Sequence, residues 1–320
     1  MLKKRNLGKT KLRVSEIGLG CWQLGGYTTI NHSPITFGDV DEKTATQIIN
    51  NALDFGINVF DTADYYSLGN SEIIIGRILK KVRSDIHIFT KAGAVPSNNY
   101  PFFEIDLSYE HLIAALRRSL KRLQTNYVDL FQIHKVPKTE KDFINVEKAF
   151  KKIKTENMAL YCGASIGVEY ESGIELIKRE IVDSIQLYFS LIDPKPLKQL
   201  FRLAKKYGVG IIVAEPLAQG LLTGKYSITH NFSKNDMRSY YGKNFIRTRL
   251  EKSKQFSFLI NDSRTLNQVA LAYILSRDEV STCIPGVTNV SQLKSNLKSS
   301  SIILTKKELQ KISKIQKKWL

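Results

Sequence analysis

The stretch NVFDTADYYSLGNSE, residues 58–72, joins a short apolar strand to a polar loop and the start of a helix. Val59 and Phe60 predict a β-strand that ends on Asp61, and a helix is expected to begin near Ser71. Asp61 is therefore expected at the carboxyl end of a strand, with Tyr66 just beyond it in the loop. A strand, a loop and a helix in this order form the repeating unit of parallel α/β folds.

The same unit recurs along the chain. Strands are predicted over residues 17–20, 58–61, 86–90, 127–134, 160–165, 184–188, 209–214 and 280–285. Helices are predicted over residues 41–55, 71–81, 108–123, 141–156, 168–179, 196–207, 265–276 and 291–299. Eight strands that alternate with helices predict an α/β fold closed into a (β/α)8 TIM barrel, and residues 1–320 are expected to form one domain.

Two further elements flank the predicted barrel. RNL and LRV flank the turn GKTK, which predicts an N-terminal β-hairpin over residues 1–16. Thr305 and Glu308 have the spacing of a capping box, which predicts an extra C-terminal helix over residues 305–318. Residues 226–262 are expected to form a long variable segment.

The alternative to a barrel is an open, doubly wound sheet that binds a dinucleotide at a Gly-rich loop. GLGCWQLGG, residues 18–26, is rich in glycine, but no helical pattern or capping residue follows it promptly. Nor does an acidic residue end a second strand about 20 residues later, as that fold requires. The sequence therefore argues against the open sheet.

The composition indicates a soluble, cytoplasmic protein. A chain of 320 residues with 42% hydrophobic content can bury a large core. The basic N-terminus lacks the apolar core of a signal peptide, and no apolar run approaches the roughly 18 residues of a membrane helix. Cys21, Cys162 and Cys283 lack metal-binding spacing, so we expect reduced, mostly buried thiols and no metal site.

The formal net charge of +18 raises the alternative of a nucleic-acid or membrane partner. However, the lysines are spread along almost every predicted helix, and the dense basic clusters are short. A solvated, lysine-rich surface explains this distribution better. We therefore expect neither nucleic acid nor membrane as a partner, although a basic surface attracts anionic substrates and cofactor phosphates.

Two more polar residues occupy places equivalent to that of Asp61. Lys91 and His134 each end an apolar strand, so with Asp61 and Tyr66 they are expected to converge on one face of the barrel. In such a cluster Lys91 should lower the pKa of Tyr66, Asp61 should hold Lys91, and a neutral His134 should orient a carbonyl oxygen. The group is suited to protonating an oxygen while another molecule delivers a hydride.

The motifs around these residues resemble those of the aldo-keto reductase family. The matching pieces, in the family's order, are GLGCWQLGG (18–26), DTADYY (61–66), FTKAG (89–93), VDLFQIHK (128–135), Ser165, Gln186, EPLAQGLLTGKY (215–226) and IPGVTNVSQLKSN (284–296). The resemblance implies a barrel plugged at its bottom by the hairpin. It also implies NAD(P)H-dependent reduction of an aldehyde or ketone, sugars included, with Tyr66 as the proton donor.

The resemblance also implies where a cofactor binds. Ser165 and Gln186 would hold the nicotinamide carboxamide, while Gly220 and Lys225 would lie at the pyrophosphate. The loop before Ser291 opens a helix, which is the usual phosphate site of a barrel. The implied cofactor contacts are Gly20, Trp22, Asp61, Ser165, Gln186, Pro216, Leu217, Gly220, Lys225, Gly286, Thr288, Gln292 and Asn296.

Three positions depart from the family pattern. Ile166 stands where an Asn usually follows the serine, and Ala214 or Glu215 stands where an aromatic ring usually stacks on the nicotinamide. Thr288 and Asn289 occupy positions at which many relatives place the cation that binds the 2′-phosphate of NADP. The resemblance implies NADP as the cofactor, and the missing cation near position 288 makes NAD the alternative.

The substrate pocket is expected to be walled by Trp22 and by the loops 25–40, 94–107 and 226–262. These loops carry Tyr27, His32, Tyr100, Phe102, Phe103, Tyr240 and Tyr241, a mixture suited to a sugar or to an aromatic carbonyl. The partner is then a small-molecule carbonyl compound, and the chain is expected to be a monomer or a weak homo-oligomer.

Two other functions are weighed against carbonyl reduction. One is a cofactor-binding regulatory subunit of the potassium channel β-subunit type, because that fold carries the same four residues. The other is a Schiff-base lyase that uses Lys91 as the nucleophile. The cofactor motifs and the neighbouring Asp61 disfavour the lyase.

Overall fold

The structure is a computed structural model that describes residues 2–320. Met1, the first residue of the predicted hairpin and domain, lies outside the described residues. Eight parallel strands form one sheet in the order β14-β13-β12-β11-β10-β7-β6-β3. Their bounds, in chain order, are β3 (Leu19–Gly20), β6 (Val59–Asp61), β7 (His87–Ala92), β10 (Val128–Ile133), β11 (Ala159–Gly167), β12 (Ser184–Tyr188), β13 (Gly210–Ala214) and β14 (Val280–Cys283).

The two edge strands of this sheet meet and close it. Ile17 and Gly20 form parallel bridges with Cys283 and Gly286, and the Gly18 amide donates to the Cys283 carbonyl over 2.8 Å. Closure satisfies backbone groups that an open edge would leave unpaired. The predicted (β/α)8 barrel is therefore confirmed.

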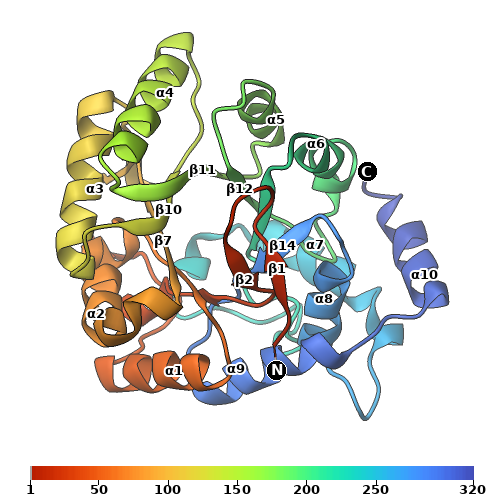
Figure 1. The fold of residues 1–320 in the computed structure, drawn as a ribbon. Helices are drawn as coiled ribbons and strands as arrows, with labels where there is room; N and C mark the ends of the chain where they lie inside the picture. The colour runs from red at the N-terminus through yellow and green to blue at the C-terminus, as the bar shows by residue number, and fades with distance from the viewer. Residues whose placement is uncertain (1) are drawn as a thin grey trace.

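Helices surround the barrel and follow the predicted alternation (Figure 1). Their bounds are α1 (Glu42–Asp54), α2 (Asn70–Leu79), α3 (Tyr109–Leu123), α4 (Glu140–Thr155), α5 (Tyr170–Lys178), α6 (Leu200–Tyr207), α8 (Leu266–Leu275), α9 (Val290–Leu297) and the C-terminal α10 (Lys306–Gln316). Side-chain caps fix several starts: Asp41, Ser108 and Thr139 each accept from a backbone amide three residues on. The capping box predicted at Thr305 and Glu308 opens α10.

The N-terminal hairpin is present and lies across one end of the barrel (Figure 1). Its strands are β1 (Lys4–Asn6) and β2 (Arg13–Ser15), paired antiparallel. Apolar side chains of the hairpin segment pack with residues inside the barrel, in a cluster made of Leu7, Leu12, Val14, Val59, Phe89, Leu130, Ile212 and Ile284. The hairpin therefore buries the interior of the barrel at the end opposite to the carboxyl ends of the strands.

The connections contain elements that the sequence pattern did not predict. Two small antiparallel pairs form, β4 (Thr29–Ile30) with β5 (Ser33–Pro34) and β8 (Ala94–Pro96) with β9 (Phe103–Ile105). Helix α7 (Lys243–Lys254) lies inside the segment expected to be variable. The buried residues of this helix are Ile246, Leu250 and Ser253. Its apolar face is therefore narrow, and the sequence shows only a weak helical pattern there.

Two predicted helices differ at their ends. The helix expected over residues 196–207 begins at Leu200, because Pro196 lies in a separate 3-10 turn, Lys195–Leu197. The helix expected to end at residue 81 ends at Leu79 and continues as a 3-10 turn, Lys80–Asp85. Across residues 2–320 no helix is long and apolar enough to cross a membrane. The three cysteines are buried free thiols.

Candidate active site

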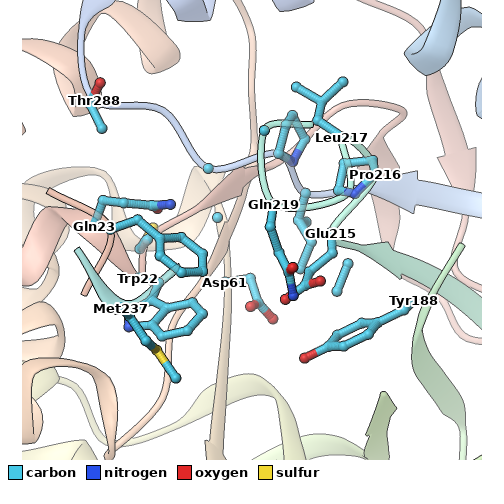
Figure 2. A pocket seen from close by; sticks show the side chains of 18 of the residues that line it. Trp22, Gln23, Asp61, Tyr188, Glu215, Pro216, Leu217, Gln219, Met237 and Thr288 are labelled. Carbon is cyan, nitrogen blue, oxygen red and sulfur yellow. The ribbon is translucent and has the colours of Figure 1, made fainter. Parts of the chain in front are cut away.

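A cavity of about 670 Å³ opens at the carboxyl ends of the barrel strands. Its size is that of a cofactor or substrate site. Figure 2 shows Asp61, Tyr188 and Glu215 on one side of this cavity, Trp22 across from them and Thr288 at its far end. The cavity brings together the residues predicted for the site, which are Gly20, Trp22, Asp61, Tyr66, His134, Ser165, Gln186, Pro216, Leu217, Gly220, Lys225, Gly286, Thr288, Gln292 and Asn296.

Lys91 lies directly beneath the cavity floor with its side chain fully buried. Its ammonium donates to Asp61 Oδ1 over 2.5 Å, to the Thr62 carbonyl over 2.8 Å and to the Tyr66 hydroxyl over 3.1 Å. Asp61 comes from the end of β6, Lys91 from β7, and Tyr66 from the loop after β6. All three donor protons of the ammonium are therefore used, and one of them reaches the Tyr66 oxygen.

Two amides complete the surroundings of Asp61. Gln186 and Gln132 donate to its other carboxylate oxygen over 2.7 and 3.4 Å. Burial raises the pKa of the Asp61 carboxyl above its ordinary value, while Lys91 and the two amides act in the opposite direction. Asp61 is thus held in one orientation from three strands, and it holds Lys91 in turn.

The Tyr66 ring is fixed between two other rings of the cavity. It stacks on Trp22 with centroids 5.7 Å apart and meets the edge of His134 at 5.6 Å. The chain turns sharply after it, since Ser67 and Leu68 have positive φ angles of 48° and 53°. The Tyr66 hydroxyl itself points inward, toward the Lys91 ammonium.

The pKa of Tyr66 corrects one expectation. The sequence predicts that Lys91 lowers this pKa, but burial raises the pKa of the Tyr66 phenol well above its ordinary value, and the charges of Asp61, Cys21 and Glu215 raise it further. The Lys91 ammonium is already paired with Asp61, so its charge does not overcome the loss of water around a buried phenolate. Tyr66 is therefore protonated near neutral pH.

His134 follows β10 and faces the same point. Burial lowers the pKa of its imidazole well below the ordinary value, and the positive charges of Lys91 and Lys135 lower it further. His134 is therefore neutral near pH 7, as the sequence predicts. Its Nδ1 is buried and has no hydrogen-bond partner within residues 2–320. The residue lines the cavity, so a polar ligand bound there can contact the exposed part of the ring.

The positions expected to bind a nicotinamide cofactor are also adjacent. Ser165 donates to Gln186 over 3.1 Å, which places a hydroxyl and an amide side by side at the ends of β11 and β12. Thr288 and Gln292 exchange two hydrogen bonds of 2.9 and 3.0 Å at the start of α9. Gly220 has a φ of 88°, which only glycine adopts easily. These neutral donors and acceptors fit the amide, hydroxyl and base groups of a dinucleotide.

The three departures from the family pattern have clear structural outcomes. Ile166 is buried in the hydrophobic core and does not line the cavity. Ala214 and Glu215 both line it, and neither has an aromatic ring. The cavity wall around Thr288 consists of the neutral residues Asn267, Ser291, Gln292, Ser295 and Asn296.

Several lining residues escaped the sequence motifs because they lie in the long connections or beside the recognised residues. Arg238 lines the cavity and bonds to Asp236, the Gln219 carbonyl and the Tyr226 hydroxyl. Residues 36–37 hold this segment, through a bridge from Phe37 to Asp236 and a 3.1 Å bond from the Met237 amide to the Thr36 carbonyl. Lys135, Tyr188 and Glu215 also line the cavity, although the sequence did not predict any of them as a site residue.

The predicted pocket walls are only partly correct. Trp22, Phe103 and Tyr241 line the cavity as expected, and Phe37 joins them. The other aromatic residues named for these loops do not line it; they are Tyr27, His32, Tyr100, Phe102 and Tyr240. Most of them lie in surface loops whose side-chain direction local sequence does not set.

Comparisons with known proteins agree with this geometry. The Aldo/keto reductase family model matches residues 16–317. The NADH-specific methylglyoxal reductase of Escherichia coli K12 is 29% identical over 320 residues, covering 95% of this chain and 95% of that protein. A putative voltage-gated potassium channel subunit beta of Schizosaccharomyces pombe is 32% identical over 342 residues, covering 97% of this chain and 92% of that protein.

A solved structure supports the same assignment. The holo form of an aldo-keto reductase from Bacillus halodurans matches with a TM-score of 0.81 and 30% identity, over 98% of this chain and 96% of that one. The residues matched by the family model include every barrel strand and the whole cavity described above. The chain therefore belongs to the aldo/keto reductase family.

Proposed function

We propose that this oxidoreductase uses NAD(P)H to reduce an aldehyde or ketone, sugars included, to the alcohol, with Tyr66 as the proton donor. The observation that carries the proposal is the 3.1 Å contact between the Tyr66 hydroxyl and the Lys91 ammonium, on the wall of a cavity that also exposes the neutral imidazole of His134. When bound, the nicotinamide supplies the hydride. The side chains of this protein supply the proton and the orientation.

The four residues have distinct roles in this proposal. His134 donates a hydrogen bond to the substrate carbonyl, which a neutral imidazole can do from one ring nitrogen. Tyr66, which is protonated at neutral pH, gives its proton to the oxygen as negative charge develops there. Lys91 then stabilises the phenolate, and Asp61 keeps Lys91 in place.

The residues expected to contact the cofactor favour NAD, although the family resemblance implies NADP as the first choice. Lys225 and Arg238 line the cavity beside the loop 215–226 and suit the pyrophosphate. Around Thr288 the lining is neutral, so a 2′-phosphate would meet no guanidinium or ammonium there. The name of the Escherichia coli relative, an NADH-specific reductase, agrees with this choice.

The test is turnover on a panel of aldehydes with NADH and with NADPH. We expect oxidation of the cofactor, faster at low concentration with NADH, and near-complete loss of turnover in Tyr66→Phe with the affinity for cofactor almost unchanged. Tyr65→Phe is the matched control, because the Tyr65 hydroxyl bonds to the Phe102 carbonyl over 2.9 Å and not to Lys91. Equal turnover in Tyr66→Phe and Tyr65→Phe would refute the proposed role of Tyr66.

A second candidate function rests on the Schizosaccharomyces pombe relative, whose name is that of a potassium channel subunit. A cofactor-binding regulatory subunit would show negligible turnover on every carbonyl and would assemble as a stable tetramer. We propose instead a cytoplasmic monomer or weak homo-oligomer, with residues 1–320 as one domain. Gel filtration with light scattering, run beside the aldehyde panel, separates the two candidates.

The lyase alternative conflicts with the position of Lys91. A Schiff base requires the lysine nitrogen to reach the substrate carbonyl. The Lys91 side chain is fully buried, does not line the cavity and donates all its protons to protein oxygens. Proton transfer through Tyr66 is the role that this geometry supports.

A further inference from the structure

Glu215 is a carboxyl group in the cavity that the four-residue mechanism does not use. It directly follows β13 and has a φ of 48°, a left-handed conformation that is strained for a residue other than glycine. Strained residues persist where the surrounding structure fixes them, and they cluster at functional sites. Figure 2 shows its carboxyl group beside the amide of Gln219 and above the ring of Tyr188.

This carboxyl group has no ion-pair partner within the described chain. Arg249, a cation whose charge acts on Glu215, is already paired with Asp193 through two hydrogen bonds. Burial raises the pKa of Glu215 to about 7, while hydrogen bonds with the Gln219 and Tyr188 side chains and the charge of Arg249 act in the opposite direction. A carboxylate can accept about four hydrogen bonds, so a ligand in the cavity can still donate one to Glu215.

Glu215 lines the same cavity as Tyr66 and His134. Its charge acts on Tyr66 and on Lys135, the residue after His134, and also on Tyr188 and Tyr241. Tyr66 and His134 mark the place of the reacting carbonyl. Atoms of a substrate next to that carbonyl would therefore lie between Tyr66 and Glu215, in a space with aromatic walls.

We propose that Glu215 determines substrate specificity by accepting a hydrogen bond from a hydroxyl group next to the reacting carbonyl, so that hydroxylated aldehydes and ketones are preferred. The inference rests on the proposed reductase function and names its substrate class. A site that hydrogen-bonds a substrate hydroxyl discriminates against an analogue without that hydroxyl, because the analogue leaves the acceptor of the protein without its hydrogen bond. The walls alone would favour the apolar analogue.

The test compares glyceraldehyde with 2-methylbutanal, in which methyl groups replace both hydroxyls at nearly constant shape. We expect the wild-type kcat/KM to favour glyceraldehyde by at least about tenfold and Glu215→Ala to abolish that preference. Glu215→Gln, which keeps an acceptor oxygen without the charge, should retain part of it. Titration of NADH by fluorescence shows that the variants fold, and it reports any change in cofactor affinity separately from the preference between the two aldehydes.

Glu180→Ala is the control for backbone strain, because Glu180 also has a positive φ, of 56°, and is exposed on the surface. Its preference should match that of the wild type. An unchanged preference in Glu215→Ala would overturn the inference while leaving the reductase function intact, and so would a loss of NADH affinity that accounts for the whole effect. Turnover of neither aldehyde, nor of any in the wider panel, would overturn both.

Discussion

At the residue scale, the site depends on buried groups that are charged or neutral for identifiable reasons. The Asp61 and Lys91 side chains are 1% and 0% exposed, so each would be costly to bury without the other. Tyr66 and His134 carry no charge because burial penalises phenolate and imidazolium alike. The site therefore combines one fixed ion pair with a neutral acid and a neutral hydrogen-bond donor.

The lowered pKa of His134 predicts a dependence of stability on pH. The unfolded chain binds a proton at this histidine below about pH 6.5, whereas the folded state does not, so folding is penalised as pH falls through that value. At pH 5.5 the penalty should be about 1.4 kcal/mol. Thermal unfolding of wild type and His134→Gln between pH 8 and 5 measures it, and the variant should lose less stability.

The control for this prediction is His32, which lies in an exposed loop. His32→Gln should follow the wild-type curve. Parallel curves for wild type and His134→Gln across the whole range would contradict the assignment of a neutral, buried His134.

At the element scale, an ion pair between helices supports the loop that carries Tyr66. Glu72 in α2 is fully buried and accepts from Thr90 of β7 over 2.6 Å and from Arg122 of α3 over 2.9 Å. The Arg122 side chain also covers Gly69, where any larger residue would collide with it. Three elements therefore fix the turn between Tyr66 and the start of α2.

This arrangement predicts the effect of Arg122→Met. The change leaves a buried carboxylate without its cation and should lower the free energy of unfolding by about 2–3 kcal/mol. Arg247→Met is the matched control, because the pair of Arg247 with Glu251 is exposed and should contribute below about 0.5 kcal/mol. Urea unfolding measures both, and equal losses would show that the α2–α3 pair does not stabilise the fold.

At the scale of the whole molecule, stability and chemistry lie at opposite ends of the barrel. The hairpin closes one end, where Leu7 is fully buried, and the cavity opens at the other. Leu7→Ala should therefore lower the free energy of unfolding by about 2–5 kcal/mol without changing kcat at temperatures where the protein is folded.

Ile303→Ala is the control for Leu7→Ala, because Ile303 is 86% exposed and should change stability by less than about 0.5 kcal/mol. Urea unfolding and initial rates on one aldehyde test the pair. A fall in kcat that parallels the loss of stability would mean that the hairpin shapes the active site as well as the core.

Much of the fold and site follows from local sequence. Val59 and Phe60 before Asp61, and the apolar runs before Lys91 and His134, specify strands that end in polar groups. Parallel strands in a closed barrel bring those ends together, so the convergence could be inferred without coordinates. Helix α7, Arg238 and the inward direction of Glu215 could not, because weakly patterned or strained backbone obtains its conformation from contacts distant in sequence.

The sequence by itself determined the alternation of strands and helices, the barrel, and the strand ends that carry Asp61, Lys91 and His134. Hydrophobic periodicity and turn residues act over a few positions, and this is why they can be read locally. Tertiary structure alone decided that Tyr66 is a raised-pKa phenol and that Glu215 lines the same cavity. These properties depend on the loss of water and on nearby charges, and both are set by residues that only folding brings together.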